Sequence, residues 1–163
     1  MPFTPFHLGP GIAIKALLQG SFSLMVFGWA QILMDIQPLL VMLTREGHLH
    51  GFSHTILGAL LIGLLAALSG KVLAELGLRL LGYQRLHPIT IRWPVALLSA
   101  LIGTFSHVSL DSIMHADVEP FYLFNLDNPM LGWISVSVLH WLCVGSGVIG
   151  GLVYLVVARE LRR

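Results

Sequence analysis

Five apolar runs alternate with short polar stretches along the chain. The runs cover roughly 8–19, 21–43, 55–82, 93–115 and 133–158. The stretches between them carry the Pro, Asp, Asn and Arg residues that are typical of loops between membrane helices. No run alternates with period two, so the pattern favours helices over strands. We therefore expect an all-α fold, a polytopic membrane helical bundle of four to five transmembrane helices that forms one domain over residues 1–163.

Local signals predict where several of these helices begin and end. Thr4 and Pro5 suit an N-cap and a first helical position, which places His7 at a helix start. Gly20 with Ser21 predicts the turn between the first two helices. Pro38 lies three residues after Asp35 and is expected to end the second helix near that carboxylate.

Composition excludes several classes of protein. Hydrophobic residues make up 56% of the chain and charged residues 10%, with a mean hydropathy of +0.84, whereas about a quarter of a soluble domain is charged. A net charge of +1 leaves no basic surface for nucleic acid, and the single cysteine excludes a disulfide framework or a thiolate zinc cluster. The first seven residues lack a cationic segment, so we expect no removable signal peptide.

Charges divide between the two ends of the predicted bundle. Six acidic residues fall toward one membrane face together with Arg45: Asp35, Glu46, Asp111, Asp117, Glu119 and Asp127. The basic residues of the other face are Lys15, Lys71, Arg79, Arg85, Arg92, Arg159, Arg162 and Arg163. Because basic residues mark the cytoplasmic side, we predict a protein of the cytoplasmic (inner) membrane whose acidic face points outward.

Polar residues within these helices are expected to meet at one depth. At 1.5 Å per residue, Asp35 lies about 20 Å from the turn at Gly20, and His54 and His107 lie about 22 Å from Ser69 and Arg92. His7 lies about 18 Å from Gln19. This depth is about two-thirds of the way across a core about 30 Å thick. His107, Asp111 and His115 are spaced four apart and share one helical face.

Imidazole and carboxylate groups together are typical ligands of transition metals. They suit zinc, manganese, iron or nickel rather than calcium or magnesium, and zinc is the leading candidate, as one or two ions. A single histidine in an apolar helix is more often a hydrogen-bonded core residue, which is our expectation for His87 and His140. Gln37 and Glu46 fit solvated loop residues.

Four motifs carry a resemblance to a known family. They are MPFTPFHLGPG, MDIQPLL, HGFSHTILGA and FSHVSLDSIMHADVEPFY with a following NP, in order over residues 1–131. Together they resemble the YdjM-like family of predicted membrane-bound metal-dependent hydrolases, especially its archaeal-type branch. The resemblance implies a metal-dependent hydrolase whose polar family positions are His7, Asp35, His54, His107 and Asp111, with His50, His115 and Asp117 matching the branch pattern.

The chain departs from that family pattern at two places. Gln37 stands where the family usually has a second acidic residue, and Leu49 with His50 stands where many members have His-Arg. The loss of a carboxylate favours one metal ion over two.

Three functions remain in competition. The leading hypothesis is a hydrolase of an ester or phosphoester near the lipid headgroups, with a phospholipid or lipid-linked phosphate as substrate and a metal-activated water. The metal ligands would be His7, Asp35, His54, His107 and Asp111, while His50 or His115 would move protons and Asp117 would orient them. A transporter of a transition metal or protons is the first alternative, disfavoured because the other halves of the helices are apolar. A non-catalytic protein stabilised by its metal is the second.

The last apolar run contains a glycine-rich stretch. Its letters, GSGVIG, match a dinucleotide-binding pattern, but no strand precedes them. We expect instead that Gly147 and Gly151 let a neighbouring helix approach, within the bundle or in a homodimer.

Overall fold

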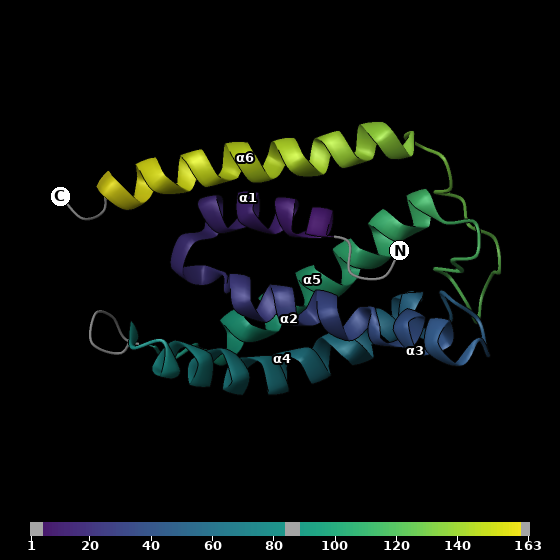
Figure 1. The fold of residues 1–163 in the computed structure, drawn as a ribbon, viewed down its shortest axis with the longest axis horizontal. Helices are drawn as coiled ribbons and strands as arrows, with labels where there is room; N and C mark the ends of the chain where they lie inside the picture. Colours follow the sequence, from purple (N-terminus) through teal and green to yellow (C-terminus); the bar gives the residue numbers. More distant parts are fainter. Residues whose placement is uncertain (1–4, 84–88, 161–163) are drawn as a thin grey trace.

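The computed structural model describes residues 5–83 and 89–160, and within these ranges it is all-helical, without strands. Three short 3-10 turns, η1 (Pro5–His7), η2 (Gln19–Ser21) and η3 (Phe52–His54), accompany the α-helices. The α-helices are α1 (Leu8–Leu18), α2 (Leu24–Met34), α3 (Ile36–Thr44), α4 (Ile56–Leu80), α5 (Trp93–Met114) and α6 (Val136–Glu160) (Figure 1). The all-α prediction is confirmed.

Within residues 5–83 and 89–160, four segments are long and apolar enough to cross a membrane. They are Leu24–Thr44, which joins α2 and α3, and the helices α4, α5 and α6. The first apolar run forms only the 11-residue α1, about 16 Å long and thus about half of a hydrocarbon core. The bundle therefore has four candidate spans and one half-length helix, within the predicted four to five.

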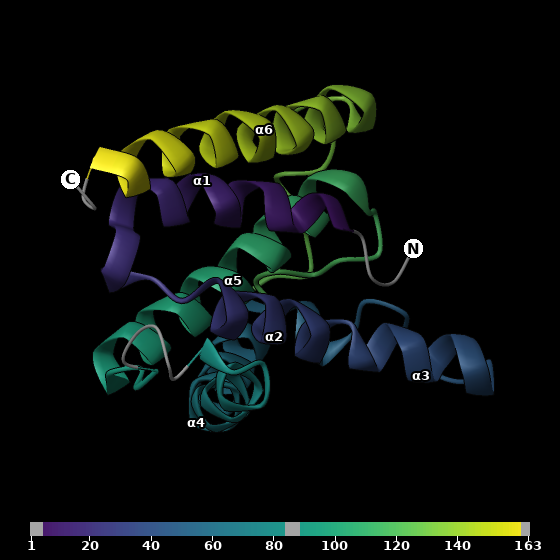
Figure 2. The same ribbon diagram turned by 60° about the vertical axis from the view of Figure 1, so that its left-hand side comes forward.

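The helices pack in layers around α1, α2 and α5. Helix α6 lies along α1, and α1 in turn faces α2, while α4 packs against α2 and α5 on the opposite side (Figures 1 and 2). A cluster of small buried residues, including Val26, Ala30, Ala66 and Ala100, fills the contact of α2, α4 and α5. Small side chains let membrane helices approach closely, which replaces the hydrophobic driving force that lipid does not supply.

The second apolar run is interrupted at Asp35, as predicted. Helix α2 ends at Met34 and α3 begins at Ile36, with Asp35 between them at φ −82° and ψ −4°. Pro38 has no N–H to donate to the carbonyl of Met34, four residues earlier, so the helical ladder breaks at this point. The carboxylate of Asp35 therefore sits at a helix junction rather than in a continuous helix.

Helix α4 matches the third apolar run, expected over 55–82, to within two residues at each end. It begins at Ile56, capped by the Thr55 hydroxyl, which accepts from the N–H of Gly58 at 2.9 Å. His50 and His54, whose spacing of four suggested that they begin this helix, therefore precede it. The helix also continues past Ser69 to Leu80, so the depth of His54 calculated from Ser69 used the wrong helix end.

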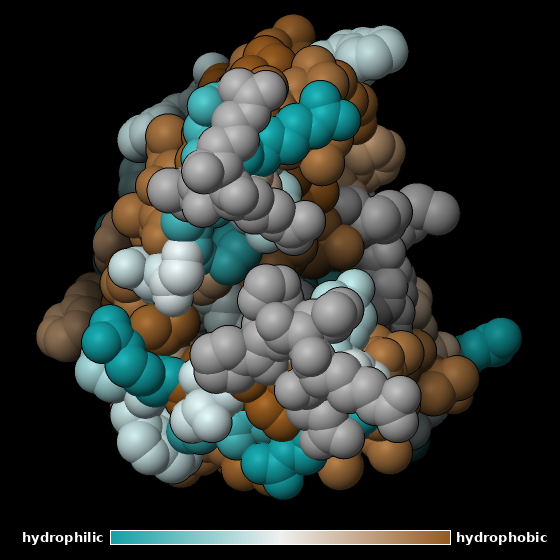
Figure 3. Space-filling view, turned by 90° about the vertical axis from the view of Figure 1, so that its left-hand side faces the viewer, coloured by the Kyte–Doolittle hydropathy of each residue, from teal (hydrophilic) through white to brown (hydrophobic). Residues whose placement is uncertain are grey.

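Basic residues gather toward the end of the bundle where α1, α4 and α6 finish and α5 begins. Figure 3 views this end and shows hydrophilic residues spread among hydrophobic ones. Lys15 donates to the carbonyls of Gln19 and Phe22 at 2.6 and 2.7 Å and so caps the end of α1. Thr4, Arg85, Arg162 and Arg163 lie outside the described residues.

Glycine lets α1 and α6 touch backbone to backbone. A Cβ on Gly9 would lie 1.9 Å from the Cys143 carbonyl oxygen, and one on Gly150 would lie 2.5 Å from the Cα of Ala13. Gly147 faces Gly9 within the bundle, whereas a Cβ on Gly151 would meet nothing within 4 Å. Within the bundle, the expectation for Gly147 is therefore confirmed and the expectation for Gly151 is wrong. The helical repeat puts Gly150 rather than Gly151 beside α1.

We expect the substitution Gly150→Ala to push α1 away from α6 and to lower the free energy of unfolding by about 1–3 kcal/mol, the usual cost of overpacking. Gly151→Ala is the matched control one residue further along the same helix, and it should leave stability unchanged or slightly raised. Thermal unfolding in detergent measures both. Equal midpoints for the two variants would contradict the glycine contact.

Candidate metal centre

Four separate segments bring imidazoles and carboxylates to one place. His7 belongs to η1, Asp35 to the junction of α2 and α3, and His54 to η3. His107 and Asp111 lie one turn apart on α5. None of these five residues is more than 6% exposed, so the cluster is enclosed by the bundle.

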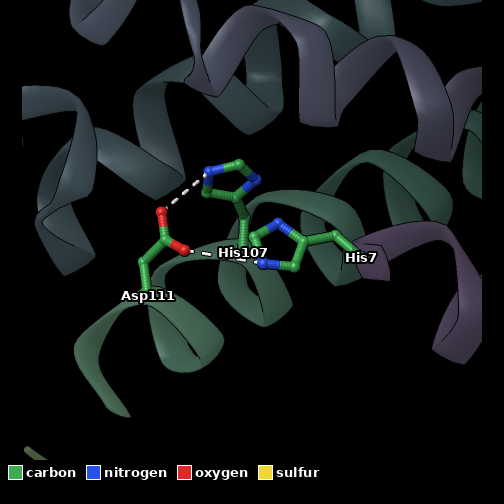
Figure 4. Close-up of side chains that lie close together, drawn as sticks. All are labelled: His7, His107 and Asp111. Carbon is green, nitrogen blue, oxygen red and sulfur yellow. Dashed lines mark ion pairs between the residues drawn. The ribbon is translucent and has the colours of Figure 1, made fainter. Parts of the chain in front are cut away.

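Asp111 is the residue that the cluster surrounds. Its Oδ1 lies 3.5 Å from Nε2 of His7, and its Oδ2 lies 3.1 Å from Nε2 of His54 and 3.2 Å from Nε2 of His107. His107 Nε2 is in turn 3.4 Å from Oδ1 of Asp35. Figure 4 shows His7 and His107 approaching the two oxygens of Asp111 from different elements.

The histidine nitrogens are close to the carboxylates without hydrogen-bonding to them. Nε2 of His7, His54 and His107 are all buried and have no partner of acceptable hydrogen-bond geometry. Buried polar atoms left unpaired in this way call for an explanation such as an ion.

The spacing of these atoms fits a metal ion. Two ligands at 2.0–2.1 Å from a tetrahedral zinc ion lie about 3.3–3.5 Å apart. The four contacts between imidazole nitrogen and carboxylate oxygen in the cluster span 3.1–3.5 Å. The buried His and Asp residues can therefore hold a metal ion, and the donor set of nitrogen and oxygen atoms is the one that transition metals prefer.

Gln31 fixes the tautomer of His107. Its side-chain NH₂ donates to the carbonyl of Gly103 at 3.0 Å, so its oxygen faces Nδ1 of His107 at 2.7 Å. Because an amide oxygen only accepts, Nδ1 carries the proton, so the neutral ring has its lone pair on Nε2. This is the outer-sphere arrangement that orients histidines that bind metals.

The loop that carries His54 is held by two further polar residues. The Ser53 hydroxyl lies 2.8 Å from Nδ1 of His54. Gln37 accepts from the N–H of Ser53 at 2.9 Å and donates to the carbonyl of His48 at 3.3 Å. The expectation of a solvated Gln37 is wrong, because it is half-buried and orders this loop; Glu46 is exposed, as expected.

His50, His115 and Asp117 form a second group beside the first. Nδ1 of His50 lies 2.9 Å from each carboxylate oxygen of Asp117. The ring of His50 stacks on that of His115, with centroids 4.4 Å apart, and meets His54 edge-on at 4.8 Å. The two histidines expected to move protons, and the aspartate expected to orient them, are thus adjacent to the five residues expected to bind metal.

Burial and the pairing of His50 with Asp117 shift the pKa values of this second group in opposite directions. Burial lowers the pKa of His50 and outweighs the hydrogen bond to Asp117, which acts to raise it. Burial likewise lowers the pKa of His115. Burial acts to raise the pKa of Asp117, but the hydrogen bond and charge of His50 together bring it below its usual value. Both imidazoles are therefore favoured in the neutral form, which can accept a proton or bind a metal.

The donor atoms fall into three overlapping groups. In each group one atom per residue lies within 4.8 Å of the others: His7, His107 and Asp111; Asp35, His54 and His107; His50, Asp111 and His115. Asp111 belongs to two of the groups and His107 to two. This overlap can accommodate one ion or two neighbouring ions that share Asp111.

A cavity of about 380 Å³, lined mostly by polar residues, opens beside the second group. We call it the loop pocket, and its lining residues are Gln37, His48, His50, Gly51, Phe52, Thr55, Glu119 and Tyr122. Because His50 lines it, the loop pocket connects the proton-moving group to the loops at this end of the bundle. Of the remaining histidines, His140 stacks on Phe6 at 4.4 Å, outside the cluster, and His87 lies outside the described residues.

Two residues at the site, Gln31 and Ser53, were not predicted from the sequence. Gln31 is a polar residue in an otherwise apolar run and lies one helical turn before Asp35, which was a usable signal because buried polar residues in membrane helices are usually functional. Ser53 gave no such signal, since a serine beside a histidine in a loop is ordinary. The sequence spacing also did not pair His50 with Asp117, 67 residues away.

Comparison with known proteins finds no family model, no curated protein and no solved structure that matches this chain. The assignment of the site therefore rests on its geometry and on the chemistry of its donor atoms.

We expect the purified protein to retain a transition metal and the substitution His107→Ala to lose most of it, because His107 takes part in two of the three donor groups. His48→Ala is the control, since His48 is an exposed histidine of the neighbouring loop. Elemental analysis by mass spectrometry gives the ion count per chain. Equal metal in both variants would rule out the cluster as the binding site.

The substitution Gln31→Leu keeps the side-chain volume and removes the acceptor for His107 Nδ1–H. We expect metal affinity to fall by about 10- to 100-fold, the usual effect of removing an outer-sphere partner. Competition with a chromogenic chelator measures the affinity. An unchanged affinity would show that the tautomer of His107 is irrelevant to binding.

Proposed function

We propose that the protein is a membrane-embedded metal-dependent hydrolase that acts on an ester or phosphoester near the lipid headgroup layer. Membership of the YdjM-like family, residence in the cytoplasmic membrane and a site facing its outer side are parts of the same proposal. Zinc is the ion that the nitrogen and oxygen donors favour first.

The observation that carries the proposal is the set of unpaired, buried imidazole nitrogens around Asp111, next to the pair formed by His50 and Asp117. A metal site that only stabilises the fold needs ligands alone. Here the pair of His50 and Asp117 lies beside the ligands as well. A divalent ion bound there would polarise the substrate oxygen and lower the pKa of water toward neutrality.

The residues around the cluster suit the proton transfers of hydrolysis. Asp117 accepts the Nδ1–H of His50 and thereby leaves the Nε2 lone pair of His50 free to take a proton from water. His115, stacked on the same ring, is the alternative proton acceptor. The loop pocket gives His50 a polar approach for water.

Transport of metal ions or protons is a less well supported hypothesis for the same residues. In the described part of the chain, every buried acid and histidine belongs to the five-residue cluster or to the adjacent group of His50. The polar residues buried elsewhere in α5 are hydroxyls such as Ser99 and Thr104. A conduction path would need ionisable groups that continue across the bundle. Their absence from the buried residues described favours chemistry at a fixed site.

We expect the purified, metal-loaded protein to hydrolyse lipid or generic phosphodiester substrates and Asp111→Asn to abolish both turnover and metal retention. Asp117→Asn should keep the metal but lower turnover by about 10²-fold or more, because it disturbs the proton acceptor and not the ion. Asp127→Asn, an exposed acid of the 115–131 loop, is the control and should behave as wild type.

Three results would overturn the proposal. Metal-loaded protein without turnover on a broad substrate panel would argue against an enzyme. Flux in proteoliposomes that depends on His107, without hydrolysis, would establish the transporter instead. A loss of thermal stability on chelation, with no activity at any stage, would establish a metal that only holds the helices together.

A further inference from the structure

An apolar groove extends from the metal centre along the side of the bundle. We call it the lateral groove; it has a volume of about 600 Å³ and lies between α1, α2 and α4. Its polar lining comes from His7, Gln31 and Asp35, and the rest of its wall is formed by apolar residues and glycines of the three helices. The groove therefore has one polar end, at the cluster, and an apolar remainder.

The groove opens toward the lipid. Met25, Ile32 and Leu73 line it and are 42%, 43% and 45% exposed. They lie on segments that are long and apolar enough to cross a membrane. Hydrocarbon chains are thus the molecules that surround the mouth of the groove.

The groove follows one face of the α2 segment. Met25, Gly28, Ile32 and Asp35 recur at intervals of three or four and share one face of the α2 segment. From Met25 to Asp35 the chain rises about 15 Å, which is half of a hydrocarbon core about 30 Å thick. An acyl chain that starts at the cluster and follows this face would run toward the start of the Leu24–Thr44 span.

We infer that the lateral groove binds one acyl chain of a membrane phospholipid and holds the bond next to its headgroup at the metal cluster. The reaction in this inference rests on the proposed hydrolase function. The binding of the acyl chain can be measured whether or not the protein is a hydrolase. An amphipathic lipid matches both parts of the groove, since its apolar chain meets the apolar wall and its ester or phosphoester meets His7 and Asp35. The loop pocket beside His50 leaves polar space for the headgroup.

Gly28 is the position at which the groove can be filled. A Cβ there would have Leu8 Cδ2 as its nearest atom at 3.7 Å, an ordinary contact, so a larger side chain can be accommodated but must occupy the groove. Gly145 on α6 is the matched control, because a Cβ there would meet nothing within 4 Å. Both substitutions to leucine also raise helix propensity equally.

The test uses a phosphatidylglycerol probe with a photoreactive diazirine in its acyl chain, added to the protein in vesicles of phosphatidylglycerol and phosphatidylethanolamine. We expect cross-links at Leu8, Met25 and Leu73 in the wild-type protein. Gly28→Leu should reduce their yield about tenfold, since it displaces two or more buried methylenes, whereas Gly145→Leu should not. Metal content should be equal in all three proteins.

Turnover separates this inference from the proposed function. Gly28→Leu should lower hydrolysis of a long-chain phospholipid and leave hydrolysis of a water-soluble phosphodiester unchanged. Cross-links in the groove without turnover of either substrate would support the lipid site and reject the hydrolase. Two results would overturn the lipid site. One is a set of cross-links that spread evenly over the lipid-facing helices and do not change in Gly28→Leu. The other is a change in the oligomeric mass of the Gly28→Leu protein in light scattering.

Discussion

Two buried carboxylates, Asp35 and Asp111, impose the main constraint on this protein. A carboxylate removed from water is costly unless it is paired or coordinates a cation. The oxygens of Asp111 lie close to the Nε2 atoms of His7, His54 and His107, and these nitrogens have no hydrogen-bond partner. A divalent cation meets both needs, because it neutralises the carboxylates and gives each nitrogen a partner. Much of the surrounding structure serves to bring these five groups together.

The irregular segments of the backbone lie where this cluster forms. A straight membrane helix presents residues at intervals of about one turn, which suffices for His107 and Asp111 on α5 but not for ligands that converge from several directions. The break before Pro38, the η1 turn and the η3 turn place Asp35, His7 and His54 at element ends. Non-helical backbone inside a membrane protein is tolerated where the protein itself buries it. Gln31, Gln37 and Ser53 supply the hydrogen bonds that hold these segments in position.

The cluster lies between two unlike environments. The lateral groove meets it at His7 and Asp35, and the loop pocket approaches it at His50. An apolar approach on one side and a polar approach on the other suit a substrate with a hydrocarbon chain and a charged headgroup. The half-length helix α1 is central to this arrangement, since it carries His7 at its start, forms one wall of the groove and is fixed to α6 by the glycine contact.

The sequence by itself determined the membrane class, the helical composition and the identity of the polar residues that meet. Apolar run lengths define the spans, and Pro38 defines the break at Asp35, because both effects are local. The tertiary structure alone decided that His50 and His54 precede α4, that His50 pairs with Asp117, that Gln31 sets the tautomer of His107 and that Gly150 rather than Gly151 touches α1. These features depend on distances between segments far apart in the chain and on the rotation of one helix against another. Hydropathy fixes which residues are buried in the membrane but not which way each helix turns.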